Sequence, residues 1–233
     1  MYYGLIIADD MEYAPFAEYA KTRPNYAEDV FYGRPSVTFS SDKGSKIRAV
    51  YCAIGKVNAG SAASFLIADG ADMILNSGLS GAINGDASNR LILVESTFES
   101  DFDMTPLGYK EFEKPKQAYI HHADERILRL AKEALPEAVV SSVACGDLFL
   151  TDPARGDYLF RTRNAEAFDM ESGAVAAVCR QCDVPFLIIR QISDGADENA
   201  AVSYRHNNEH ALHRHLMADI RFIDRFDEEN QIR

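Results

Sequence analysis

The sequence has no run rich in lysine and arginine. Its 24 Lys and Arg residues stand against 36 Asp and Glu residues, which gives a net charge of −12. Nucleic acids and anionic membrane surfaces are usually bound through a basic patch, so we expect neither as a partner. No apolar run is long enough to cross a bilayer, and the first residues (MYYG) lack the basic character of a secretory signal.

Cysteine is also scarce. Four cysteines (Cys52, Cys145, Cys179 and Cys182) in 233 residues do not make a disulfide scaffold, so a reduced, cytoplasmic setting is expected. Cys179 and Cys182 form a lone CxxC without the second pair that would complete a zinc site, which favours ordinary thiols. Linkers, repeats and shifts of composition are absent too, and we expect one domain over residues 1–233.

Short apolar runs alternate with stretches of helical periodicity. The expected strands are residues 2–8, 47–54, 72–76, 90–96, 139–145 and 185–192, and the expected helices are residues 60–69, 124–135, 173–182 and 206–225. Residues 185–192 are largely apolar on both alternating faces, which is typical of a strand covered on both sides. The alternation predicts an α/β fold with a parallel or mixed sheet between helices.

Polar or glycine-rich segments follow four of these strands. They are residues 9–12, 77–81, 146–147 and 193–195. In open α/β sheets, ligands bind beyond the carboxyl ends of the strands. We therefore expect these distant segments to meet at one edge of the sheet and form one site.

Two other motifs favour structural interpretations. Residues 55–60 (GKVNAG) match neither a dinucleotide-binding nor a phosphate-binding loop, and predict a tight turn into a closely packed helix. A histidine-rich helix holds the residues His206, Glu209, His210, His213 and His215. Some of these share a face at i,i+3 and i,i+4 spacing, but there is no HExxH order, so a solvated helix face is favoured over a metal site.

Carboxylates beside strand ends carry the candidate chemistry. Glu171 precedes a small-residue helix (residues 172–177), whose dipole should favour the ionised carboxylate that a ribose diol requires. Asp194 ends a buried strand, where a raised pKa would suit a general acid. Together with Glu12 and Asp169, these residues indicate a hydrolase that uses two carboxyl groups.

Three segments bear a specific resemblance to a known family. Residues 146–150 (GDLFL), 168–174 (FDMESGA) and 189–197 (IRQISDGAD) look like the G-D-x-F-I, V-E-M-E-x-x-A and V-R-x-I-S-D-x-A-D segments of the 5′-methylthioadenosine/S-adenosylhomocysteine nucleosidases of the nucleoside phosphorylase superfamily. The likeness covers most of the chain and is strongest from Cys145 to Asp197. It implies a three-layer α/β/α fold with a central mixed, partly barrel-like sheet, and a homodimer.

The resemblance also implies roles for single residues. Asp194, oriented by Ser193, would protonate the purine ring, and Glu12 with Arg190 would position and activate water. The implied binding residues are Phe149 and Leu150 for the base, Met170 and Glu171 for the ribose, Tyr204 for the 5′ end, and Met104, Leu107 and Tyr109 contributed by the dimer partner.

The implied reaction is hydrolysis of the N-glycosidic bond, which releases adenine and a 5′-thioribose. An acid neutralises the leaving base while a carboxylate on the opposite side activates water, so neither a metal nor an organic cofactor is expected. A phosphorylase would need cations to hold phosphate, whereas the first strand leads to Asp9, Asp10 and Glu12. Water is therefore the expected nucleophile.

The chain departs from the family pattern near the expected sugar and 5′ site. Asp9 and Asp10 follow Ala8 where the family usually has G-A-M followed by glutamates, Leu79 replaces a usual serine, and Gln191 stands where a small residue is common. These changes leave other readings open. They are a phosphorylase, a nucleosidase for a related purine nucleoside such as futalosine, and a nucleoside-binding protein without turnover.

Overall fold

The computed structural model describes residues 1–83, 90–195 and 208–231, except the side chains of 208–211 and 231. Within that part of the chain the strands are β1 (Tyr2–Ile7), β2 (Ala27–Phe31), β3 (Arg34–Ser40), β4 (Lys46–Tyr51), β5 (Met73–Ala82), β6 (Leu91–Glu99), β7 (Ile120–His122), β8 (Val139–Cys145), β9 (Ala165–Asp169) and β10 (Phe186–Asp194). The helices are α1 (Asp10–Lys21), α2 (Lys56–Ala68), η1 (Thr105–Leu107, 3-10), α3 (Glu125–Ala134), α4 (Pro153–Arg163), α5 (Ser172–Gln181) and α7 (Asn208–Gln231).

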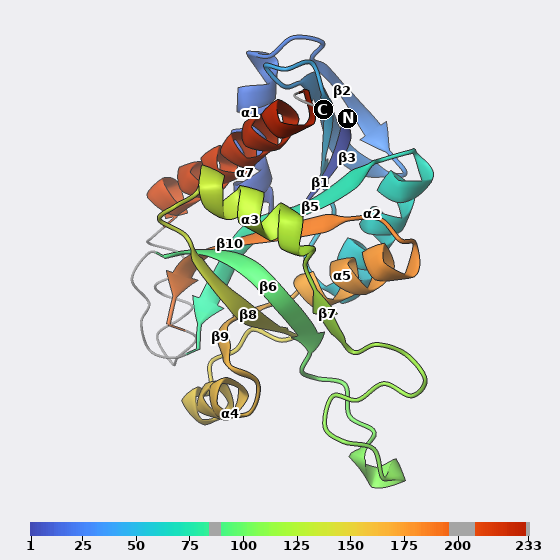
Figure 1. Cartoon of the computed structure of the whole chain (residues 1–233), viewed down its shortest axis with the longest axis vertical. Helices are drawn as coiled ribbons and strands as arrows, with labels where there is room; N and C mark the ends of the chain where they lie inside the picture. Colours follow the sequence, from blue (N-terminus) through green and yellow to red (C-terminus); the bar gives the residue numbers. More distant parts are fainter. Residues whose placement is uncertain (84–89, 196–207, 232–233) are drawn as a thin grey trace.

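The strands form one mixed sheet that closes on itself at one end. The order is β10-β6-β8-β9-β5-β1-β4-β3-β2, and β10 also pairs with β5. Five strands (β5, β10, β6, β8 and β9) therefore make a closed barrel, from which β1, β4, β3 and β2 continue as an open sheet (Figure 1). The prediction of a mixed, partly barrel-like sheet between helices is confirmed.

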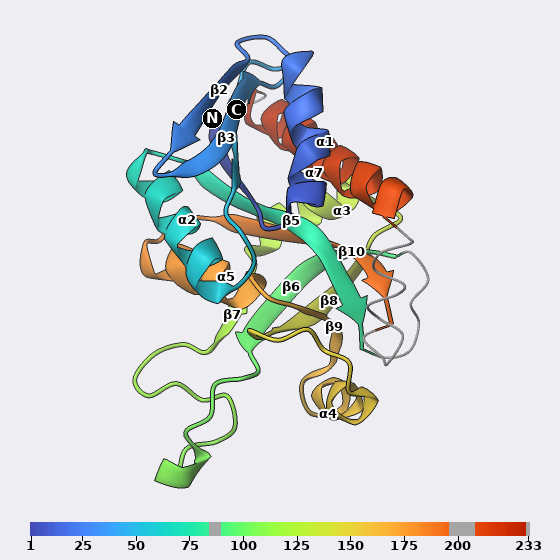
Figure 2. The same cartoon turned by 180° about the vertical axis from the view of Figure 1, so that it is seen from behind.

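Helices cover both faces of the sheet. One buried cluster joins α1, α3 and α7 to the strands and contains Phe16, Leu130 and Phe222, while a second joins α2 and α5 and contains Leu66 and Val175. Figures 1 and 2 show these two groups of helices on opposite sides of the strands. Burial of the apolar faces of both groups supplies the main driving force for this arrangement.

The expected helices and strands all form, but several bounds differ. The turn predicted for residues 55–60 is confined to Gly55, at φ +104°, and α2 starts at Lys56. A Cβ on Gly60 would lie 3.7 Å from Ala174 of α5, so the predicted close helix packing is confirmed. The described elements that were not predicted are α1, α4, η1, β2, β3, β7 and β9.

Strand β5 runs six residues further than expected and includes Ser77–Gly81, the glycine-rich segment that was expected to follow the strand. Gly78 pairs with Arg190 of β10. A Cβ at Gly78 would lie 2.9 Å from Glu12 Oε2, so the glycine leaves room for that carboxyl group. The small residues therefore serve close approach within a strand rather than a turn.

The segment between β6 and β7 projects from the body of the molecule and carries η1 (Figures 1 and 2). Leu107, at the end of η1, is 72% exposed. Among the described helices, none combines the length and apolar character needed to span a membrane.

Candidate active site

A cavity of about 160 Å³ opens at the carboxyl ends of the strands. Its described lining residues are Ala8, Asp9, Glu12, Ile54, Leu79, Ser80, Gly81, Leu148, Phe149, Leu150, Phe168, Asp169, Met170, Glu171, Ser193 and Asp194. The four strand ends predicted to meet, those of β1, β5, β8 and β10, all contribute to it. The end of β9 adds Asp169 and the two residues after it.

Asp194 and Ser193 form one polar corner of the cavity. Ser193 Oγ donates to Asp194 Oδ2 at 2.8 Å and lies 3.4 Å from the Ser80 carbonyl oxygen. Both side chains are buried, at 3% and 4% exposure. The serine hydroxyl therefore holds one carboxyl oxygen of Asp194 in a fixed orientation at the cavity wall.

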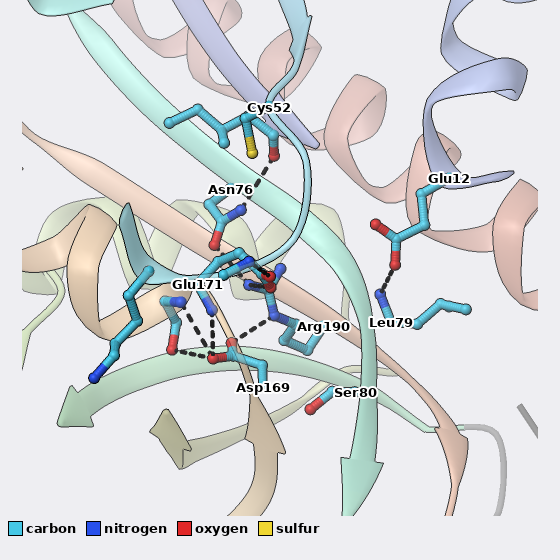
Figure 3. Close-up of polar contacts among 12 residues, drawn as sticks. Glu12, Cys52, Asn76, Leu79, Ser80, Asp169, Glu171 and Arg190 are labelled. Atoms are coloured by element: carbon cyan, nitrogen blue, oxygen red, sulfur yellow. Dashed lines mark hydrogen bonds and ion pairs between the residues drawn. The ribbon is translucent and has the colours of Figure 1, made fainter. Parts of the chain in front are cut away.

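Glu12 enters the cavity from the first turn of α1. This helix starts because the Asp9 side chain accepts a hydrogen bond from the Met11 amide at 2.8 Å. Glu12 Oε1 accepts from the Leu79 amide at 2.7 Å (Figure 3). Burial raises the pKa of Glu12 to about 8, with a further contribution from the negative charge of Glu171 and opposition from the Leu79 amide and Arg190.

Behind the cavity wall, Arg190 is held by a buried polar network (Figure 3). Its Nε donates to Asp169 Oδ2 at 2.7 Å, and its Nη2 donates to Asn76 Oδ1 at 2.6 Å. Asp169 Oδ1 accepts from Ser172 Oγ at 2.8 Å. Arg190 is 1% exposed and is not a lining residue, so its charge acts on the cavity from behind the residues that line it.

Glu171 lines the cavity at the start of α5. Its Oε1 accepts from the Gly55 amide at 3.0 Å, and its Oε2 lies 3.7 Å from Arg190 Nη2. Burial raises its pKa to about 7; Arg190 lowers it and Asp169 raises it. Desolvation in the confined site therefore opposes the ionised form that the helix dipole was expected to favour.

Part of the cavity lining is apolar. Phe149 is 48% exposed at the mouth, whereas Leu150 and Phe168 are each 4% exposed in the wall. Met170, half-buried, also lines the cavity.

An ion-pair network that the sequence did not suggest anchors the loop bearing Phe149. Asp147 accepts from the Lys56 amide at 2.8 Å, and its own amide donates to Asp101 at 2.9 Å. Lys56 Nζ donates to Asp101 at 2.6 Å and to Glu99 at 3.1 Å. These residues are far apart in the chain, so no local spacing could have revealed them.

Some candidate residues lie elsewhere. Met104, Leu107 and Tyr109 belong to the projecting segment and do not line the described cavity. Tyr204 and His206 lie outside the described residues. On α7, the expected solvated face is confirmed for His213 but is wrong for His215, which is completely buried.

In the part of the chain that the structure describes, no three His, Cys, Asp or Glu side chains are arranged to hold a metal ion. The four cysteines are free thiols, and Cys179 is buried whereas Cys182 is exposed.

Comparisons with known proteins show what this chain is similar to. A family model described as the phosphorylase superfamily matches residues 2–222. A 5′-methylthioadenosine/S-adenosylhomocysteine nucleosidase from Anoxybacillus flavithermus is 31% identical over 170 residues, which cover 69% of this chain and 73% of that protein. An aminodeoxyfutalosine nucleosidase from Campylobacter jejuni is 30% identical over 201 residues, 83% of this chain and 85% of that protein.

Two solved structures have the same fold as this chain. The methylthioadenosine/adenosylhomocysteine nucleosidase of Helicobacter pylori, in complex with a pyrrolidine inhibitor, superposes with a TM-score of 0.89 at 26% identity, covering 96% of this chain and 98% of the other. A structure described as the futalosine hydrolase of Helicobacter pylori also has a TM-score of 0.89 at 26% identity, covering 96% and 97%.

Proposed function

This chain belongs to the phosphorylase superfamily, and we propose that it is an N-glycosyl hydrolase that cleaves 5′-methylthioadenosine and S-adenosylhomocysteine to adenine and the corresponding 5′-thioribose. One observation carries the proposal: a single cavity is lined by Asp194, which Ser193 orients, and by Glu12. The same lining contains apolar side chains and the carboxyl group of Glu171. Cleavage through an oxocarbenium-like transition state requires such a pair, an acid for the leaving group and a carboxylate that activates water.

Asp194 and Glu12 have different roles in the proposed reaction. Asp194 donates its proton or a hydrogen bond to the purine ring, so that adenine departs as a neutral base. Glu12, ionised, takes the proton of the attacking water. The Leu79 amide fixes one Glu12 oxygen and leaves the other for water. Each such group typically contributes ~10²–10⁴-fold to the rate.

The remaining residues bind and position. Phe149 stacks on the adenine, backbone groups of Leu150 contact its edge, and Met170 packs beneath the sugar. Glu171 holds the ribose hydroxyls. Arg190 is a positioning residue, because its donors hold Asp169 and Asn76 and its positive charge favours the ionised forms of Glu12 and Glu171.

Water is favoured over phosphate by the charge of the cavity. Its lining includes the carboxyl groups of Asp9, Glu12, Asp169, Glu171 and Asp194, and no Lys or Arg among the described residues. A phosphate dianion would meet carboxyl groups and no Lys or Arg side chain in that wall.

The test is a nucleoside panel assayed with and without phosphate. Methylthioadenosine and adenosylhomocysteine should release adenine at the same rate in both conditions, and the sugar product should carry no phosphate. Dependence on phosphate would establish a phosphorylase. Tight binding without release of base from any nucleoside would establish a binding protein without turnover.

A second candidate is hydrolysis of a futalosine-type nucleoside. The Campylobacter jejuni relative aligns over more of this chain than the Anoxybacillus flavithermus one, and Asp9 and Leu79 alter the cavity wall near Glu12. Aminodeoxyfutalosine therefore belongs in the same panel. A kcat/KM for it that exceeds the value for methylthioadenosine would make it the substrate.

We further propose that the enzyme is a homodimer of the cytoplasm. Exposed apolar side chains occur on the projecting segment (Leu107, Tyr109) and close to the cavity mouth (Ile54, Phe149), which suits a face that a second copy covers. Free cysteines suit a reducing compartment. Light scattering should give twice the chain mass, and Leu107→Asp should give monomers with a raised KM; a monomeric wild-type enzyme would contradict the dimer.

A further inference from the structure

A group of buried polar side chains lies between α7 and β5, outside the cavity. His215 and Asp219 are one turn apart on α7, and both are 0% exposed. Ser77 of β5 is 1% exposed. Among the described residues, no hydrogen-bond partner exists for either ring nitrogen of His215, either carboxyl oxygen of Asp219, or the Ser77 hydroxyl.

Asp219 interacts with Ser77, and Asp219 and His215 both feel the charge of Arg190, which lies behind the cavity wall. The Ser77 hydroxyl is near enough to Asp219 to lower the pKa of that carboxyl, although the pair lacks hydrogen-bond geometry. Arg190 acts on the charge of both Asp219 and His215. Burial nevertheless dominates: it raises the pKa of Asp219 to about 7 and lowers that of His215 to about 3.

The imidazole of His215 is therefore neutral, with one donor and one acceptor nitrogen. Buried polar groups in folded proteins are nearly always satisfied, and an internal water with two to four polar partners is the usual way when side chains do not reach one another. A metal ion suits the site less well, since it would have one imidazole and one carboxyl ligand and the positive charge of Arg190 nearby.

We propose that Ser77, His215 and Asp219 enclose a buried water site, and that this water joins α7 to the β5 segment that orients the catalytic groups. The inferred role of this water in orienting the catalytic groups rests on the proposed nucleosidase function. The presence of the water does not depend on that function.

The location of Ser77 supports the link to catalysis. The residue before it, Asn76, accepts from Arg190 Nη2, and Leu79, two residues after it, donates its amide to Glu12. On the other side, Phe16 lies one turn after Glu12 on α1, and its ring packs against His215 with centroids 5.5 Å apart. His215 thus contacts α1 through Phe16, and Ser77 belongs to β5; these are the two elements that hold Glu12.

The first test is a high-resolution crystal structure of the wild-type protein. We expect water within hydrogen-bond distance of Asp219, His215 and Ser77. An empty site, or a direct hydrogen bond between Asp219 and either other side chain, would overturn the proposal. This readout does not depend on activity.

The second test is kinetic and applies once adenine release by the wild type is established. Asp219→Leu removes the polar partner and should lower kcat about tenfold or more, with KM nearly unchanged, because small displacements of positioned groups are costly to rate. Asp219→Asn keeps the water partner and should retain a kcat close to wild type. Glu228→Leu, at an exposed site on the same helix, is the matched control and should have no effect.

A merely structural role for Asp219 predicts a lower melting temperature with unchanged kcat below it, and that result would overturn the positioning role. Equal loss of kcat in the Asn and Leu variants would overturn the water bridge, since it would show that the carboxylate itself is required.

Ser77→Ala is the milder variant if Asp219→Leu fails to fold. It should lower kcat in the same direction, and an unchanged kcat would contradict the link through β5. If the wild type releases no base from any nucleoside, the proposed function fails while the crystallographic test of the water site stands.

Discussion

Replacing Glu12 by glutamine should make the protein less active and more stable. Glu12 is 5% exposed, and burial raises its pKa from 4.5 to about 8. The folded state therefore binds a proton that the unfolded chain releases above pH 4.5. Glutamine has no proton to lose and can still accept the Leu79 amide through its carbonyl oxygen.

The size of the effect follows from this difference in pKa. One pKa unit corresponds to about 1.4 kcal/mol, so the full difference is on the order of 5 kcal/mol above pH 8 and roughly 3 kcal/mol at pH 7. Because the folded pKa is raised, wild-type stability falls as pH rises from about 4.5 to 8. Glu12→Gln lacks this loss, so its advantage should grow over that window and then level off. Adenine release should fall ~10²–10⁴-fold, since the base is gone.

The assay is urea unfolding of wild type and variant from pH 5 to 9, with Glu125→Gln as the control at an exposed position. We expect the free energies of unfolding to converge near pH 5 and to separate by a few kcal/mol at pH 8, with no such trend in the control. Equal pH dependence of wild type and Glu12→Gln, or a less stable Glu12→Gln at pH 8, would refute the reasoning from burial.

Three further predictions concern the reaction. Asp194→Asn should lower single-turnover adenine release ~10²–10⁴-fold while methylthioadenosine still binds in calorimetry; activity within tenfold of wild type would exclude Asp194 as the acid. Because Glu12 must be ionised to act as base, kcat/KM should rise with pH up to an apparent pKa near 8, and a flat profile from pH 6 to 9 would remove Glu12 from that role. Phe149→Ala should raise the KM for methylthioadenosine ~5–100-fold through lost stacking, with kcat less affected; the exposed Val30→Ala is its control, and an unchanged KM would mean that the base binds elsewhere.

Parts of the site could be read from the sequence because the relevant signals are local. Residues 2–8 and 185–192 are largely apolar runs that acidic or hydroxyl residues follow, and parallel strands present their carboxyl ends at one edge. That reasoning brought Glu12 and Asp194 to one site, and the cavity lining contains both.

Other features of the fold could not be predicted from the sequence, because they depend on residues that are distant along the chain. Helix α1 contains Pro15, which usually marks the end of a helix, so its pattern did not suggest one. The small residues of β5 resemble a turn, and only the carboxyl group of Glu12 beside Gly78 explains why they belong to a strand. The closure of the barrel depends on the pairing of β10 with both β5 and β6, segments separated by about a hundred residues.

The sequence by itself determined which chemical groups the protein has and which strand ends carry them, because hydrophobic periodicity and polar punctuation depend on neighbours along the chain. Tertiary structure alone decided their states. It placed Arg190 behind the cavity wall, raised the pKa values of Glu12 and Glu171, and buried His215 where a solvated face was expected. The physical reason is desolvation, whose strength at each group depends on how closely distant segments pack around it.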